Sequence, residues 1–310
     1  MNQTIGQQQQ TIAIQQQQIA SLNQSIDTAH TASTRQQAVT EVAFAQMNQT
    51  ISMINQSIIT AGPRIPPISS CAGVLSANTS AVSGIYNISI FALGVSWPVW
   101  CEMRNGTAWT LLMKIDGSQT RFSFSSSLWT TSSTLNEPLS LGQDNLEYKS
   151  VLYNMMPFTQ LLLGMRSRSD PYTATRWTTM SYAGASLLDV ISRPQPTLVT
   201  SKNSTVARAD FLSIVGPDAE SCSLQPYCNQ VGFNLIPDPD SASGVYYSQS
   251  VSLRIGIIAN EQVDCGSPDS FIGFGGYHGV PTQSLLASGC RGAFPGGSNS
   301  IPRFGYILAR

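Results

Sequence analysis

The sequence has little charge. Asp, Glu, Lys and Arg make up only 11% of its 310 residues, and the formal net charge at pH 7 is −1. A nucleic-acid partner would need a basic face, so this balance argues against nucleic-acid binding. The sequence also lacks a long apolar run, because the nearest, residues 89–100, is too short to span a membrane. The opening MNQTIGQQQQ has neither the basic nor the apolar region of a signal peptide, so we expect none in this sequence.

Histidine is nearly absent, since the sequence holds only His30 and His278. A catalytic nucleophile needs a neighbouring base, and no G-x-S-x-G motif surrounds His278. Zinc would need clustered His and Cys, which the sequence does not supply. The glycine-rich run of residues 273–279 lacks the following helix of a dinucleotide-binding loop. We therefore expect that the protein is not an enzyme.

Cysteines and glycosylation sequons are present in numbers that indicate an oxidising compartment. Six cysteines, an even count, are typical of a secreted, disulfide-bonded protein. Spacing alone favours Cys222–Cys228 together with Cys265–Cys290, although other connectivities stay open. The sequons lie at Asn2, Asn23, Asn48, Asn55, Asn78, Asn87, Asn105 and Asn203. We expect an extracellular or cell-surface protein with glycans on the C-terminal part at Asn78, Asn87, Asn105 and Asn203.

Residues 1–60 are rich in Gln and carry apolar residues at heptad spacing. These residues are Ile5, Ile12, Ile19 and Ile26, followed by Phe44, Met47, Ile51, Ile54 and Ile58. The pattern predicts the a and d positions of a coiled coil, with a Gln-rich disordered tail as the alternative. An isolated helix of this kind would expose its apolar stripe, so we expect it to self-associate. Pro63, Pro66 and Pro67 end the helix and make residues 61–70 a linker.

The stretch of residues 251–276 changes character halfway. Its first part alternates apolar residues, which predicts a strand that enters a core. Its second part brings four oxygen-bearing side chains into a Gly/Pro/Ser-rich loop around Cys265. They are Asn260, Glu261, Asp264 and Asp269. Such a loop is suited to Ca²⁺, and the alternative is an acidic surface loop without a ligand.

Several motifs resemble those of fibrinogen-like domains. RIGIIANEQ, the cysteine after it and IGFGGY are similar to the C-terminal part of intelectins and related invertebrate fibrinogen-like domains. Cys71, SGIYNI (83–88), PVWCEM (98–103) and AWTLL (108–112) resemble the opening of the same fold. The resemblance spans residues 71–310. It implies an α+β class: a fibrinogen-like, intelectin-like head with short strands and long loops, preceded by an α-helical coiled-coil stalk.

The resemblance also implies a disulfide pairing and an assembly. Its first bridge closes the hairpin that carries SGIY, which corresponds to Cys71–Cys101 in this sequence. Its bridge to the ligand loop corresponds to Cys228–Cys265, and Cys222–Cys290 then remains. Related fibrinogen-like lectins are commonly based on trimers, so we expect a homotrimer through residues 1–60.

A calcium site follows from the same resemblance. The Asn-Glu pair of the family corresponds to Asn260 and Glu261, and a later ligand position corresponds to Asp269. The acidic residue expected after the last cysteine would fall near Gly292 and is missing. The side chains that contact sugar are expected among Tyr277, His278 and Phe294, although His278 could equally be a loop residue without a ligand role.

Two functions are consistent with this reading. The first is a secreted, oligomeric, calcium-dependent lectin that recognises glycans or glycoproteins. The second is a structural glycoprotein subunit of an extracellular or ciliary fibre that uses the same fold for protein–protein contacts.

Overall fold

A computed structural model describes most of the C-terminal part of the chain. The described residues are 15, 17–27, 70–90, 94–137, 139–200, 205–217, 222, 224–237, 251–263, 265–278, 284–291 and 300–310. The chain divides into two units, Met1–Pro66 and Pro67–Arg310. In the first unit residues 17–27 are helical and expose their apolar side chains Ile19, Leu22 and Ile26. Among the described residues, no helix has the length and apolarity needed to cross a membrane.

The second unit is built on two antiparallel sheets, which we call sheet A and sheet B. The order of sheet A is β1 (Gly84–Ile90), β2 (Val95–Arg104), β3 (Thr107–Asp116), β13 (Phe304–Ala309), β5 (Phe158–Arg166) and β6 (Arg176–Gly184), with β4 (Tyr148–Lys149) paired to β3. The order of sheet B is β12 (Ser300–Pro302), β11 (Ser284–Arg291), β10 (Ser270–His278), β9 (Val251–Asn260), β8 (Tyr227–Leu235) and β7 (Thr197–Leu198).

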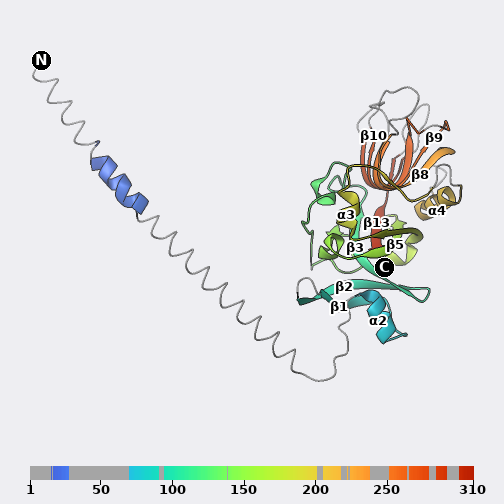
Figure 1. Cartoon of the computed structure of the whole chain (residues 1–310), viewed down its shortest axis with the longest axis horizontal. Helices are drawn as coiled ribbons and strands as arrows, with labels where there is room; N and C mark the ends of the chain where they lie inside the picture. Colours follow the sequence, from blue (N-terminus) through green and yellow to red (C-terminus); the bar gives the residue numbers. More distant parts are fainter. Residues whose placement is uncertain are drawn as a thin grey trace, which may run out of the picture. The chain divides into compact units, whose positions relative to one another are not determined.

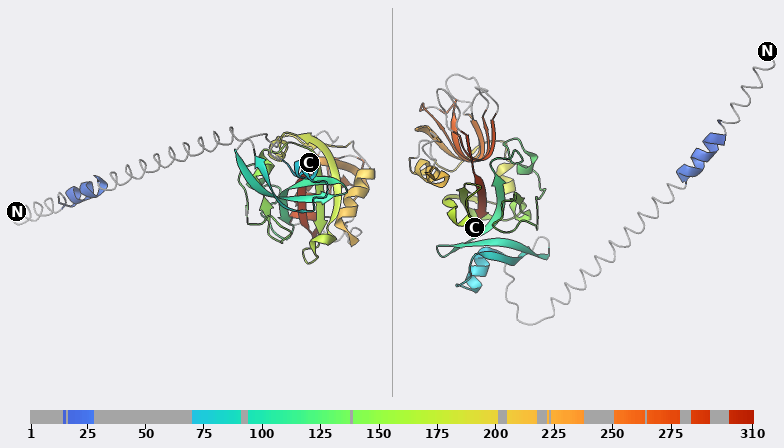
Figure 2. Two further views of the ribbon diagram at one scale, coloured as in Figure 1. Left: turned by 90° about the horizontal axis from the view of Figure 1, so that it is seen from below. Right: turned by 180° about the vertical axis from the view of Figure 1, so that it is seen from behind.

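Short helices fill the spaces around the sheets. They are α2 (Cys71–Ala77), α3 (Leu187–Ile191) and α4 (Thr205–Val215), with 3-10 turns η2 (Ser127–Trp129), η3 (Val151–Asn154) and η4 (Tyr172–Ala174). Sheet B lies at one end of the unit, and β1, β2 and α2 lie at the other (Figure 1). The strands β3, β5 and β13 lie between these ends, and the view from behind shows the same order (Figure 2).

The hairpin of β2 and β3 follows directly from its turn sequence. Asn105 and Gly106 both have positive φ, 49° and 71°, and Arg104 pairs with Thr107 across the turn. A two-residue turn of this hand matches the twist of the strands, and Asn-Gly tolerates its backbone angles. The dipeptide Asn-Gly between two apolar runs is by itself a signal for a hairpin, and the structure forms that hairpin. Its tip leaves Asn105 exposed, as a glycan on this sequon requires.

The C-terminal strand β13 lies in the middle of sheet A, hydrogen-bonded to β3 on one side and to β5 on the other. All six of its residues are buried. A strand covered on both faces reads as a continuous apolar run rather than an alternating one, and FGYILA has that composition. Just before it, the Arg303 N–H donates to the Ser288 carbonyl of β11 at 3.0 Å, which links the two sheets.

Four glycines lie opposite one another across sheet B. Gly232 of β8 faces Gly256 of β9, which faces Gly273 of β10, which faces Gly289 of β11. We call these four residues the glycine row. At Gly273 an added Cβ would lie 2.1 Å from the Ile255 carbonyl oxygen, so the backbones of neighbouring strands approach more closely here than any side chain allows.

The fold class predicted from the sequence is wrong. The described chain is mostly β, with two sheets and short helices, rather than α+β with a coiled-coil stalk. Within the described ranges no long helix of the coiled-coil kind is present, and most of residues 1–60 lie outside them. The strands are also longer than predicted, since β2, β3 and β9 have 10 residues each. The physical reason is that apolar runs such as that of β13 are buried between neighbouring strands, so most of the described chain lies in the two sheets.

Smaller differences have local causes. The helix α3 precedes the short β7, and Ser186 caps this helix by accepting from the Asp189 N–H at 3.0 Å. The helix α4 was not predicted. Self-association of residues 1–60 as a homotrimer stays a prediction.

Three disulfides connect the second unit. The bridges are Cys71–Cys101, Cys222–Cys290 and Cys228–Cys265, and the structure has no free cysteine. This is the pairing that the family resemblance implied, and the pairing favoured by local spacing alone is not formed. Each bridge joins segments at least 30 residues apart in the sequence, and Cys222 and Cys228 each pair with a cysteine of a later segment.

Candidate functional site

The loop from β9 to β10 carries the residues predicted to bind calcium. The strand β9 ends at Asn260, and β10 begins at Ser270 opposite Ala259. The Asp269 N–H donates to the Ala259 carbonyl at 3.1 Å, which closes the loop at its base. The structure therefore places Glu261 and Asp269 at the two ends of one loop, at the same end of sheet B.

The disulfide Cys228–Cys265 holds this loop against β8. Tyr227 pairs with Asn260, and the next residue, Cys228, has a φ of +48° that turns it out of the regular ladder. Its partner Cys265 lies within the loop and is buried. A covalent bond at this place restricts the loop in both the folded and the unfolded chain. The two carboxylates beside it are consequently held on a restrained backbone.

Gln225 brings the two carboxylates to one point. Its side-chain Nε2 donates to Glu261 Oε2 at 2.7 Å and lies 3.5 Å from Asp269 Oδ2. Its backbone N–H donates to Ser270 Oγ at 3.0 Å, which holds Gln225 beside the first residue of β10. The sequence gives no sign of this role for Gln225, because the residue lies far from the loop in sequence and only the strand pairing brings it there.

Asn260 has a positioning role in this arrangement. It is fully buried, and its Oδ1 accepts the Glu261 N–H at 3.0 Å. Its Nδ2 donates to Gln262 Oε1 at 3.2 Å, and Gln262 Nε2 donates to Glu261 Oε1 at 2.6 Å. Both Glu261 oxygens thus accept hydrogen bonds from side-chain amides. These contacts orient an exposed carboxylate that would otherwise sample many rotamers.

The electrostatics of the pair are unfavourable at neutral pH. Partial burial of Asp269, with the Glu261 carboxylate beside it, raises the Asp269 pKa to about 6. A negative charge beside Asp269 disfavours the ionised form of Asp269, and a proton or a cation relieves the repulsion. We call Glu261, Asp269 and the Gln225 amide the acidic-loop site.

Few side chains at the acidic-loop site could bind a metal ion. Within the described ranges, no three His, Cys, Asp or Glu side chains cluster in a way that could hold a metal ion. The predicted metal ligands include two carboxylates, those of Glu261 and Asp269. Three further positions named in the prediction lie outside the described residues: Asp264, Gly292 and Phe294. A cation here would depend on Glu261, Asp269, amide or carbonyl oxygens and water, which is a donor set that Ca²⁺ accepts.

The predicted sugar-contacting residues on β10 lie away from this loop. Tyr277 and His278 are at the far end of β10, where they pair with Ser252 and Val251. At about 3.3 Å per residue, Tyr277 lies roughly 25 Å along the strand from Asp269. His278 is also buried. The structure therefore does not bring these two residues to the acidic-loop site, since adjacency in a sequence motif says nothing about which end of a strand a residue occupies.

A buried cation precedes the position near Gly292 at which the resemblance led us to expect an acid. Arg291, directly after Cys290, is buried and pairs with Phe271 on β10. Burial lowers the pKa of its guanidinium, and in the described part of the chain its Nε and Nη2 have no hydrogen-bond partner. Arg291 therefore places a positive charge at the same end of sheet B as the acidic-loop site.

The sequon asparagines that can be placed are accessible. Asn78 at the end of α2, Asn87 on β1 and Asn105 on the β2–β3 turn are all exposed. Asn203 lies outside the described residues. A glycan can be attached only to an accessible asparagine, so these three positions stay candidates for glycosylation.

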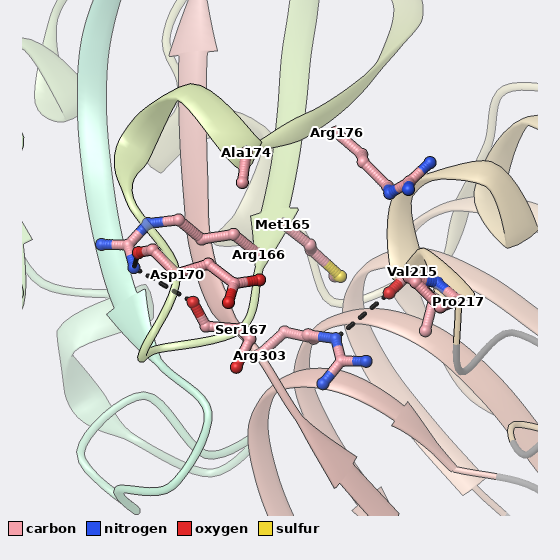
Figure 3. Close-up of a pocket in the computed structure, with 9 residues that line it drawn as sticks. All are labelled: Met165, Arg166, Ser167, Asp170, Ala174, Arg176, Val215, Pro217 and Arg303. Carbon is pink, nitrogen blue, oxygen red and sulfur yellow. Dashed lines mark hydrogen bonds between the residues drawn. The ribbon is translucent and has the colours of Figure 1, made fainter.

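A second concave feature was not predicted from the sequence. A cavity of about 140 Å³ lies between the ends of β5 and α4 and the starts of β6 and β13 (Figure 3). Its lining residues are Met165, Arg166, Ser167, Asp170, Ala174, Arg176, Val215, Pro217 and Arg303. These come from three segments far apart in the sequence, residues 165–176, 215–217 and Arg303, so no local pattern could have revealed the cavity.

No protein-family model matches the chain, and no curated protein matches it. Among solved structures the chain is similar to lamprey fibrin D-dimer, determined with the peptide Gly-His-Arg-Pro-amide. The identity is 17%, the TM-score is 0.24, and the match covers 56% of this chain and 55% of that one. The chain thus spans about half the length of that structure.

Proposed function

We propose that this protein is an extracellular carbohydrate-binding protein whose acidic-loop site holds Ca²⁺. The observation that carries the proposal is the convergence of Glu261 and Asp269 on one amide, on a loop held by a disulfide. Such a site has excess negative charge and a restrained backbone, which favours a hard divalent cation. Three disulfides support residence in an oxidising compartment.

Sugar would bind through the cation. Ca²⁺ takes six to eight oxygen ligands, and two carboxylates with amide oxygens leave several positions open. Vicinal hydroxyls of a sugar can occupy such positions. Two acidic charges make a site of modest strength, so we expect calcium affinity suited to calcium-rich extracellular fluid. Residues at the far end of β10, Tyr277 among them, have no part in this proposal.

The test is replacement of Glu261 by glutamine. Loss of one of the two charges should weaken calcium binding roughly tenfold to a hundredfold and abolish calcium-dependent retention on a glycan array. Glu261 is exposed, so the melting temperature without calcium should stay unchanged. Calorimetry with calcium, and array binding with and without EDTA, provide the measurement.

Asp210→Asn is the matched control. Asp210 is an exposed carboxylate on α4, and its replacement makes the same change of charge away from the acidic-loop site. It should bind calcium and glycans like the unmodified protein. Absence of calcium heat in the unmodified protein would contradict the proposal and favour the alternative, a structural glycoprotein subunit. The lack of the acid expected near Gly292 is the observation that favours this alternative.

Acidification should release calcium at an unusually high pH for a carboxylate site. Because the Asp269 pKa is raised to about 6, this side chain is protonated below that pH and becomes a poor ligand. Calcium affinity should therefore fall between pH 7 and pH 5, rather than near the ordinary pKa of aspartate. Titrations at several pH values should show this fall. Asp269→Asn should bind calcium weakly and lose the pH dependence over this range.

The raised pKa of Asp269 also predicts how the stability of the calcium-free protein changes with pH. A raised carboxyl pKa means that the folded state binds the proton more tightly than the unfolded state does. The contribution of Asp269 to the free energy of unfolding should therefore decrease as pH rises from about 4 to about 6. Asp269→Asn should remove this part of the pH dependence, measured by urea unfolding in EDTA.

A further inference from the structure

We propose that the cavity beside the end of α4 is a second binding site, for a small carboxylate that also carries a hydroxyl or amino donor. It shares no residue with the acidic-loop site and does not depend on the proposed function. We call it the arginine pocket. Two guanidinium groups and one carboxylate line it from different elements, with apolar surface between them (Figure 3).

Arg303 supplies a fixed positive charge. It is 8% exposed, and its Nε donates to the Val215 carbonyl at 3.2 Å. Val215 is the last residue of α4, whose carbonyl end carries partial negative charge that attracts a cation. The guanidinium is therefore oriented by the helix end and borders the cavity. Its backbone is fixed as well, because it joins the two sheets.

Arg176 provides a second guanidinium at the same side of the cavity. It begins β6 and lies against Gly216, which ends α4 with a φ of +88°. An added Cβ at Gly216 would lie 2.9 Å from Arg176 Nε, so glycine at this position is what lets the two approach. Arg176 is exposed, and within the described residues its side chain has neither an ion pair nor a hydrogen bond.

Asp170 faces the arginines from the loop between β5 and β6, and its carboxylate has no ion-pair partner in the described part of the chain. Figure 3 shows it on the opposite side of the pocket from Arg176 and Arg303. Arg166 does not compete for it, because its guanidinium is turned away. That group donates to the Asp170 carbonyl at 2.6 Å, to the Ser167 carbonyl at 3.1 Å and to Tyr306 Oη at 3.0 Å.

The chemistry of the ligand follows from this arrangement. Two guanidinium groups on one side favour a planar anion, and a carboxylate is the group that arginine binds in a two-pronged manner. A single carboxylate on the opposite side requires a donor on the same ligand. The volume of about 140 Å³ equals roughly four to five water molecules, which fits the acid end of a sugar acid or an amino acid.

The apolar part of the lining restricts the ligand further. Met165 and Val215 are buried, and Ala174 and Pro217 close the cavity from the side of the loops. These four side chains would contact the C–H groups of the ligand and offer no hydrogen bonds. A fully hydrated inorganic anion gains little from them, whereas a carbon chain does.

The experiment titrates the full chain with D-glucuronate, glycine and acetate in EDTA, followed by NMR or calorimetry. EDTA removes any contribution of the acidic-loop site. Glucuronate and glycine represent a hydroxyl and an amino donor, and acetate has neither. We expect saturable binding of glucuronate or of glycine. The one that binds more tightly shows whether the natural ligand carries a hydroxyl donor, as a sugar acid does, or an amino donor, as an amino acid does. Acetate should bind more weakly than that ligand.

Three variants test the geometry. Arg176→Gln should weaken binding of that ligand about tenfold, the effect of one charge-assisted contact. Asp170→Asn should weaken it similarly but leave acetate binding equal or tighter, because acetate has no donor and is repelled by the carboxylate. Arg193→Gln removes an exposed charge beside α3 and should change nothing. Asp170, Arg176 and Arg193 are exposed, so unchanged melting temperatures will show that the variants fold.

Four outcomes would overturn the proposal. The first is no saturable binding of either donor-bearing acid by the folded protein. The second is equal affinity in Arg176→Gln. The third is acetate binding as tight as that of the better acid. The fourth is tighter binding of sulfate than of either acid, which would make the cavity a general anion site.

Discussion

Gly273→Ala should lower the free energy of unfolding by about 4 kcal/mol or more, or prevent folding of sheet B altogether. The added Cβ would lie 2.1 Å from the Ile255 carbonyl oxygen and 2.9 Å from Gly256 Cα. Both are backbone atoms within a sheet, so neither can move aside as a side chain could. The φ of +157° adds strain for a residue with a side chain. Urea unfolding of the purified variant gives the measurement.

Gly142→Ala is the control for this substitution. Gly142 has nothing within 4 Å of an added Cβ and no positive φ, so its replacement should change stability by less than about 0.5 kcal/mol. A Gly273→Ala protein as stable as this control would show that the strands of sheet B do not approach as closely as the glycine row indicates.

Removal of the Cys228–Cys265 bridge should have the second large effect. Replacement of both cysteines by serine should cost about 4 kcal/mol of stability, because the bridge closes a loop with a sequence separation of 37 residues. It should also abolish calcium binding, since Glu261 and Asp269 would then lie on a loop that is no longer tied to β8. Calorimetry with calcium, at a temperature where the variant is folded, separates the two effects.

The Cys71–Cys101 bridge provides a matched comparison. Its sequence separation is 30 residues, so its removal should cost a similar free energy. It joins α2 to β2 in sheet A, away from the acidic-loop site. Calcium affinity should therefore persist in Cys71→Ser/Cys101→Ser. If both double variants lose calcium binding equally, the loss reflects general destabilisation, and the loop has no special dependence on its bridge.

Local chemistry in the sequence was sufficient for several features. The Asn105–Gly106 turn, the strand that leads into Asn260 and the strand that ends the chain each depend on a few adjacent residues. Their backbone preferences or apolar runs have one obvious outcome. The loop with Asn260, Glu261 and Asp269 was found in the same way, because dense oxygen donors among glycines stand out without any tertiary information.

Contacts between distant segments decided the rest. The α+β class was wrong because most of the described chain lies in long strands, and their pairing joins segments that are far apart in the sequence. Tyr277 and His278 follow the loop in sequence but lie at the other end of β10, since a strand extends its residues rather than gathering them. Gln225 reaches the carboxylates, and Arg176, Arg303 and Asp170 surround one cavity, through strand pairing and helix packing alone. Such neighbours leave no trace in a single sequence because their proximity is set by the whole fold.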